Sequence, residues 1–151
     1  MNVAFLLIPK INIAYTYEDS TLRQGLEKMR RSGYAAIPVL SRDGKYICTV
    51  TEGDFLWHLL DDPKDANRRI DIRTTEKTML RDVIRRDCNP PVRIDAEIEE
   101  LLTRAMAQNF VPVVDDRDGF SGIVTRKDII GKFVREYMVN TREDETQAAL
   151  K

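Results

Sequence analysis

"IPVLSRDGKYICTVTEGD" at residues 37–54 and "VPVVDDRDGFSGIVTRKD" at residues 111–128 align with each other without a gap. Both stretches contain a Pro-Val pair, an Asp-Gly turn, and a Thr three residues before an Asp. Upstream of each stretch, apolar residues recur at helical spacing once a short length difference is allowed. Self-similarity of this kind is the sequence signature of a repeated structural unit. The sequence therefore predicts two copies of one unit.

Each unit is predicted to run strand, helix, strand, strand, helix. Short alternating runs indicate strands, and apolar residues three or four positions apart indicate helices. A capping residue among 19–21 and Gly33 bound the first long helix. The first unit is predicted to contain strands 13–17, 36–40 and 45–51 with helices within 18–33 and 53–60. The second is predicted to contain strands 92–94, 110–114 and 120–125 with helices within 95–109 and 126–138.

The two units are expected to form one α+β (α/β) domain. One unit alone buries too little apolar surface to be stable, and the other unit is the available cover for its sheet. We predict sheet-to-sheet packing with pseudo-twofold symmetry and helices outside. The predicted boundaries are a first repeat at 3–62, a linker at 63–79, a second repeat at 80–138, and a polar tail at 139–151 that frays.

Composition excludes several classes of function. The 151 residues are 42% hydrophobic and 32% charged, with a formal net charge of −1. The chain as a whole therefore has no net electrostatic attraction to nucleic acid or to an anionic membrane. The basic clusters "RRS", "RRID" and "IRRD" are interpreted as solvated faces. No stretch approaches the roughly 20 apolar residues of a membrane span. The N-terminus lacks the basic region and cleavage site of a signal peptide, so the predicted location is cytoplasmic.

Residue types that commonly act in catalysis, such as Cys and His, are scarce in this sequence. Cys48 and Cys88 do not make a disulfide framework, and His58 is the only histidine. No metal-ligand spacing and no nucleophile set is visible, so we predict that the chain is not an enzyme. Trp57 is expected in the core or at a dimer contact.

The repeated motif resembles the CBS domain, and the chain looks like a stand-alone tandem CBS pair. The resemblance rests on "GYAAIPVLSRDGKYICTVTEGD" and "NFVPVVDDRDGFSGIVTRKD" within about residues 3–138. It implies two clefts between the repeats, each able to hold AMP, ADP, ATP, S-adenosylmethionine or cyclic di-AMP. It also implies a disc-shaped homodimer and a regulatory role toward a separate partner protein, with no cofactor beyond the regulatory nucleotide.

The resemblance places the ligand-binding residues at the two Thr-x-x-Asp motifs. Asp54 and Asp128 are expected to accept hydrogen bonds from the ribose hydroxyls, with Thr51 and Thr125 beside them. Each Asp lies in the first turn of a helix, whose free N–H groups and partial positive charge favour a phosphate. We call the two predicted sites the Asp54 cleft and the Asp128 cleft.

The adenine is expected between apolar walls beside these motifs. By position in the repeat, the walls are Ala36, Ile37 and Pro38 in the first unit and Phe110, Val111 and Pro112 in the second. Tyr15 and Tyr17, with Val92 and Ile94 opposite, are further candidates for the walls.

The residues between Thr and Asp distinguish the two clefts. Arg126 and Lys127 would place positive charge near a phosphate, whereas Glu52 and Gly53 would not. This difference favours the Asp128 cleft as the phosphate site, with Arg23 as a candidate cation for the Asp54 cleft.

Two alternatives stay open at this point. A Thr or Asp at a helix start is also an ordinary N-cap, and a cleft can persist as fold geometry without a ligand. The chain is therefore either a nucleotide-sensing module or a structural dimerisation module that binds no nucleotide.

Overall fold

The computed structural model of the chain describes residues 2–60 and 72–151. The first half contains η1 (Val3–Phe5), β1 (Ile8–Pro9), η2 (Lys10–Asn12), β2 (Thr16–Tyr17), α1 (Leu22–Ser32), β3 (Ala36–Leu40), β4 (Tyr46–Thr51) and α2 (Glu52–Leu60). The second half contains α3 (Ile72–Lys77), η3 (Leu80–Asp82), β5 (Val92–Arg93), α4 (Ile98–Ala107), β6 (Phe110–Val114), β7 (Phe120–Thr125) and α5 (Arg126–Ala149).

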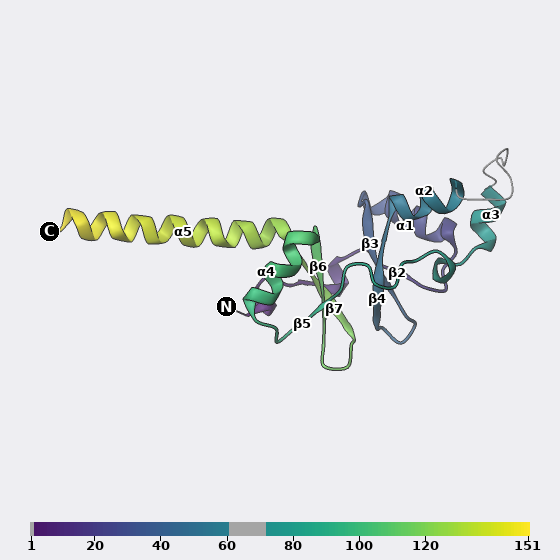
Figure 1. Cartoon of the computed structure of the whole chain (residues 1–151), viewed down its shortest axis with the longest axis horizontal. Helices are drawn as coiled ribbons and strands as arrows, with labels where there is room; N and C mark the ends of the chain where they lie inside the picture. Colours follow the sequence, from purple (N-terminus) through teal and green to yellow (C-terminus); the bar gives the residue numbers. More distant parts are fainter. Residues whose placement is uncertain (1, 61–71) are drawn as a thin grey trace.

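The strands form two sheets with the same internal pattern (Figure 1). One sheet has the order β2-β3-β4, and the other has the order β1-β7-β6-β5. In each sheet a parallel pair is followed by an antiparallel hairpin, and Ile37 faces Val50 as Val111 faces Val124. The predicted order strand, helix, strand, strand, helix is confirmed in both units, and so is the mixed α/β fold class.

Local sequence signals fix the ends of α1. The Thr21 hydroxyl accepts a hydrogen bond from the Gln24 backbone N–H, and the Gln24 side chain accepts one from Thr21 N–H, which completes a capping box. Gly33 ends the helix at a φ of 75°, in the left-handed region where glycine carries no steric penalty. The predicted start and end of this helix are therefore confirmed.

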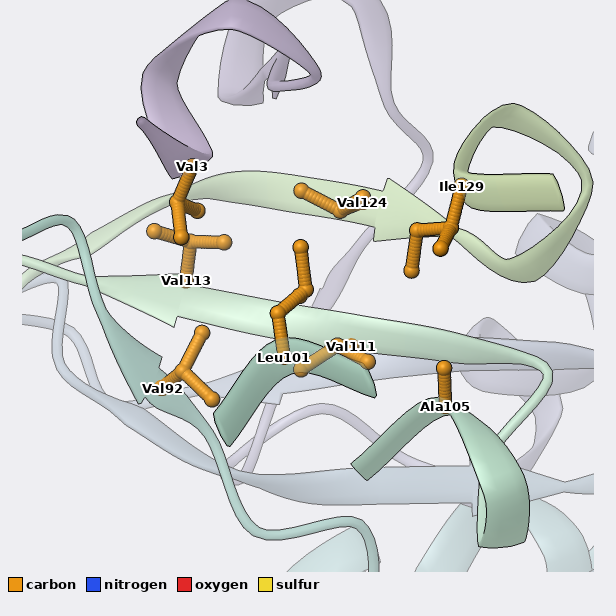
Figure 2. Close-up of a cluster of buried hydrophobic side chains, with 8 residues drawn as sticks. All are labelled: Val3, Val92, Leu101, Ala105, Val111, Val113, Val124 and Ile129. Carbon is orange, nitrogen blue, oxygen red and sulfur yellow. The ribbon is translucent and has the colours of Figure 1, made fainter. Parts of the chain in front are cut away.

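Each repeat has its own hydrophobic core, and the two leading segments are exchanged between them. Val3, from the start of the chain, packs in the second core with Leu101 and Val124 (Figure 2). Leu80, which leads into the second repeat, packs in the first core with Leu22 and other buried residues. Residues 3–9, which the sequence assigned to the first repeat, therefore contact the second.

Backbone hydrogen bonds make the exchange specific. β1 pairs antiparallel with β7, where Ile8 faces Ile123 and Pro9 faces Gly122. On the other side, Leu22 N–H donates to Thr78 O at 2.9 Å, and Leu80 N–H donates to Ser20 O at 2.8 Å. The two repeats are joined through both leading segments.

The two Asp-Gly turns also meet between the repeats. Phe120 N–H donates to Gly44 O at 2.9 Å, and Tyr46 N–H donates to Asp118 O at 3.3 Å. The rings of Tyr46 and Phe120 stack with centroids 6.0 Å apart. Equivalent positions of the two repeats thus contact one another, as pseudo-twofold packing requires.

The C-terminal segment differs from the sequence-based expectation. α5 continues for 24 residues to Ala149 and extends away from the two sheets as one long helix, whereas a frayed tail from 139 was predicted (Figure 1). Residues 139–149 contain neither Gly nor Pro and include the helix formers Arg, Glu, Gln and Ala, which sustain the helix. Part of the predicted linker, 63–71, lies outside the described residues, and α3 occupies 72–77.

Two further expectations concern exposure and membranes. Trp57 is 65% exposed, so it is not a core residue. Among the helices in the described ranges, none is long and apolar enough to cross a bilayer.

Candidate functional site

The Asp54 cleft is a groove between the first repeat and the segment that leads into the second. It has a volume of about 550 Å³. Its lining residues include Thr51, Asp54, Trp57, His58, Asp82 and Arg85. An adjoining cavity of about 350 Å³ shares Thr51 and is lined by residues that include Ala36, Asn89, Gln108 and Phe110. Residues of both repeats therefore surround a two-part space.

Asp54 is held by three hydrogen bonds at one end of this space. Its Oδ2 accepts from Thr51 N–H at 2.9 Å, and its own N–H donates to Thr51 Oγ1 at 3.2 Å. Its Oδ1 accepts from Arg85 Nε at 2.8 Å. The Asp54 side chain is only 9% exposed, whereas that of Arg85 is 58% exposed.

The charged pair affects the acid-base behaviour of Arg85. The hydrogen bond to Asp54, followed by the Coulomb attraction of the same carboxylate, raises the pKa of Arg85 above its ordinary value. Arg85 is therefore a permanent cation at the cleft. Each carboxylate oxygen of Asp54 has two lone pairs, so both oxygens retain acceptor capacity beyond these contacts.

The Asp128 cleft is smaller and more apolar. It encloses about 180 Å³. Its lining residues include Ile8, Ala14, Ala36, Pro38, Phe110 and Thr125. Thr125 Oγ1 accepts from Asp128 N–H at 3.1 Å, the same cap as in the first repeat, but the cavity lining includes Thr125 and not Asp128.

The two predicted cations of the Asp128 cleft lie elsewhere. Arg126 donates from Nε to Ala105 O at 2.8 Å, on the α4 side of the helix start. Lys127 is exposed to solvent. Neither residue lines the 180 Å³ cavity, so the charge comparison drawn from the sequence does not describe this geometry.

The predicted apolar walls divide according to the two faces of each strand. Ala36, Pro38 and Phe110 line the clefts. Ile37 and Val111 are buried in the two cores instead, since successive residues of a strand point to opposite faces. Pro112 is buried and pairs with Ile123.

The remaining candidates are engaged outside the described clefts. Tyr15 contacts Tyr17 edge-on, and it also contacts Phe120 with centroids 6.5 Å apart. Arg42 lies over the Tyr17 ring at 4.1 Å. Arg23, near the start of α1, pairs with Glu27 and Glu76. Val92 is in the second core and Ile94 packs against it.

The comparison with known families divides the chain into the same two repeats. The family model of the CBS domain matches residues 8–61 and residues 78–135. The two matches coincide with the two repeats and cover more than half of the chain.

The chain belongs to the CBS-domain family.

Solved structures share the fold of this CBS pair. A hypothetical conserved protein of Geobacillus kaustophilus is 25% identical and has a TM-score of 0.79, covering 90% of this chain and 98% of that one. Listeria monocytogenes CbpB, in complex with cyclic di-AMP, is 24% identical with a TM-score of 0.78, covering 91% and 98%. CBSX2, in complex with AMP, is 18% identical with a TM-score of 0.70, covering 90% and 98%.

The structure also adds site residues that the sequence did not indicate. Arg85 belongs to "IRRD", which was interpreted as a solvated face, and Asn89 and Gln108 were not singled out. A signal for Arg85 existed in the repeat itself. When the leading segments of the two repeats are aligned, Arg85 falls at the position of Ile8, and Ile8 lines a cleft. Within 2–60 and 72–151, no group of three or more His, Cys, Asp or Glu residues is placed to hold a metal ion.

Proposed function

We propose that the chain is a regulatory module that senses an adenine nucleotide bound between its CBS repeats. The observation that carries the proposal is the Asp54 cleft, where a fixed carboxylate adjoins an apolar compartment. The ribose hydroxyls would donate to Asp54, and the adenine would lie in the 350 Å³ cavity between Ala36 and Phe110. Structures of the same fold in complex with cyclic di-AMP and with AMP support this class of ligand.

The Asp54 cleft is the better candidate for the main site. Its 550 Å³ groove and the adjoining 350 Å³ cavity are both larger than the 180 Å³ of the Asp128 cleft. Ligand pockets are commonly about 300–1,000 Å³ in volume. The Asp128 cleft, which Thr125 helps to line, is proposed as a secondary site for part of a nucleoside.

Calorimetry tests the proposal directly. The full chain is titrated with AMP, ADP, ATP, cyclic di-AMP and S-adenosylmethionine, and at least one of them is expected to bind. Asp54→Asn keeps the shape of the side chain but removes its charge. It should lower affinity by roughly 1.5–3 kcal/mol, the worth of hydrogen bonds to a charged group. Asp128→Asn should have the smaller effect.

Two outcomes contradict the proposal. Absence of binding heat with all five ligands at high protein concentration would exclude the sensor function. An unchanged affinity in Asp54→Asn, together with a large loss in Asp128→Asn, would move the site to the other cleft.

The sensor is proposed to act on a separate protein as a homodimer. A ligand shifts a conformational equilibrium only if it binds the two states with different affinity. The Asp54 cleft contacts both repeats, so occupancy would change how they are held together. The second copy is expected to dock on the exposed apolar side chains of α5, which include Ile130, Val134 and Tyr137.

The alternative is a structural module that binds no nucleotide, and one observation favours it. Asp54 already has partners for both carboxylate oxygens, from Thr51 N–H and from Arg85. The cap and the ion pair therefore stabilise the fold without a ligand. The same calorimetry distinguishes the two functions.

A further inference from the structure

Arg85 determines the charge balance of the Asp54 cleft. Of the eight described residues that line the 550 Å³ groove, Asp54 and Asp82 are acids and Arg85 is the one residue that is always cationic. The lining therefore has one permanent positive charge against two carboxylates. Without Arg85 it would contain two carboxylates only, and these would repel a phosphate.

The geometry leaves most of the guanidinium available to a ligand. A guanidinium has five N–H donors, and Asp54 takes the one on Nε. The other four are on the two terminal nitrogens, and the Arg85 side chain is 58% exposed at the cleft. Arg–phosphate pairs are frequently bidentate, which requires two such N–H groups on one side of the fork.

Building on the proposed nucleotide site, we propose that Arg85 makes the Asp54 cleft selective for phosphorylated nucleosides over neutral nucleosides. Asp54 binds the ribose, and Arg85 orients Asp54 through Nε while its terminal nitrogens bind the phosphate. The two functions come from different repeats, because Asp54 lies in the first turn of α2 and Arg85 follows η3 in the leading segment of the second repeat. A phosphorylated ligand therefore bridges the repeats, whereas a nucleoside contacts Arg85 only through Asp54.

The adjacent arginine provides a matched control. Arg86 has its Nη2 3.7 Å from Glu18 and lines a different cavity, with Lys45, Tyr46 and Asp118. It has the same formal charge and the same place in the chain, but it does not line the Asp54 cleft. Loss of Arg86 removes the same net charge from the protein without touching the proposed phosphate contact.

The experiment compares AMP with adenosine, which differ only by the phosphate. Both are titrated calorimetrically into the full chain and into Arg85→Ala, Arg85→Lys and Arg86→Ala, after thermal unfolding has shown that each variant is folded. Arg85→Ala should weaken AMP by at least about tenfold and change adenosine by no more than about twofold, since about 1.4 kcal/mol corresponds to tenfold in affinity. Arg85→Lys should restore part of the AMP affinity, and Arg86→Ala should leave both affinities unchanged.

Other outcomes overturn the inference in distinct ways. If AMP and adenosine weaken in parallel in Arg85→Ala, Arg85 only supports Asp54 and does not select the phosphate. If AMP is unaffected, the phosphate lies elsewhere. If the wild-type chain binds neither ligand, nor any other adenine nucleotide, the proposed function fails as well.

Discussion

Cys48 is a free thiol inside the first core, with no exposed surface. Burial raises the pKa of this thiol to about 12, because the thiolate would lose its hydration. An unfolded chain releases the same proton near pH 8.5. The stability that Cys48 contributes is therefore fully present below about pH 8.5 and is lost as the pH rises toward 12.

This difference gives a prediction for mildly alkaline solution. Between pH 7.5 and 9.5 the free energy of unfolding should fall by about 1.4 kcal/mol through Cys48 alone, since the unfolded state binds fewer protons than the native state. Urea denaturation at several pH values measures this slope in a range where most unfolded tyrosines are still protonated. Cys48→Ala should flatten the curve, and Cys88→Ala should keep most of the slope. Parallel curves for the wild type and Cys48→Ala would contradict the prediction.

Tyr46 and Phe120 show how one hydroxyl group makes the two repeats differ. They occupy equivalent positions and stack on each other, but the Tyr46 hydroxyl also donates to Asn89 O at 2.8 Å. Asn89 has a φ of 53°, a left-handed conformation that Asn adopts more readily than most residues. The hydroxyl therefore helps to fix the segment that carries Arg85 and lines the Asp54 cleft, and Phe120 has no such group for the other cleft.

At the scale of elements, β1 depends on a glycine in its neighbour. β1 contains only Ile8 and Pro9, and it pairs with β7 beside Gly122. A Cβ atom at Gly122 would overlap the carbonyl oxygen of Ile8, which is backbone and has little freedom to move. The equivalent residue of the first repeat is Cys48 in β4, and within 2–60 and 72–151 this strand is at the edge of its sheet with no further strand beside it.

We expect Gly122→Ala to weaken the attachment of the leading segment. Either β1 or β7 must shift, and such overpacking typically costs about 1–3 kcal/mol. Urea denaturation should show this loss, and the amide protons of β7 should exchange faster. Gly131→Ala, within α5, is the control. Its Cβ would meet only the Arg135 side chain, so alanine should stabilise the helix by about 0.5–1 kcal/mol. Equal stability of Gly122→Ala and the wild type would mean that β1 is not held there.

The elements differ in how far the sequence predicts them. Periodic residues and the Thr21 and Gly33 signals were sufficient for the strands, the hairpins and α1. The exchange of leading segments was not visible, because a two-residue strand has no period and its partner lies far along the chain. In 139–149, polar composition indicated a frayed tail, while helix propensity decided the structure.

For the whole molecule, the candidate site was predictable only in part. The paired Thr and Asp residues are short-range patterns within each repeat, and in both repeats the Thr hydroxyl caps the backbone N–H of the Asp. Arg85 reaches Asp54 from 31 residues away through the packing of the two repeats. In the sequence, such a cation is marked only by its position in the repeat, whereas Arg126 and Lys127 lie inside the Thr-x-x-Asp motif and favoured the other cleft.

Self-association is the last prediction, and it rests on the outer surface of α5. Ile130, Phe133, Val134 and Tyr137 recur at helical spacing on this helix and are 40–72% exposed. Apolar residues at positions i, i+3, i+4 and i+7 form a stripe on one face, which in a soluble protein is normally covered. The stripe is on the helix that extends from the sheets, where a second copy has room to approach (Figure 1).

We therefore expect sedimentation velocity to give twice the 17.4 kDa of one chain for the wild type. Tyr137→Asp should produce monomers, because an unpaired carboxylate in an apolar interface loses its hydration without compensation. Met106→Asp is the matched control, since Met106 is 86% exposed on α4 and lies outside the stripe. A wild type that stays monomeric at high concentration, or a Tyr137→Asp variant that dimerises as well as Met106→Asp, would exclude α5 as the interface.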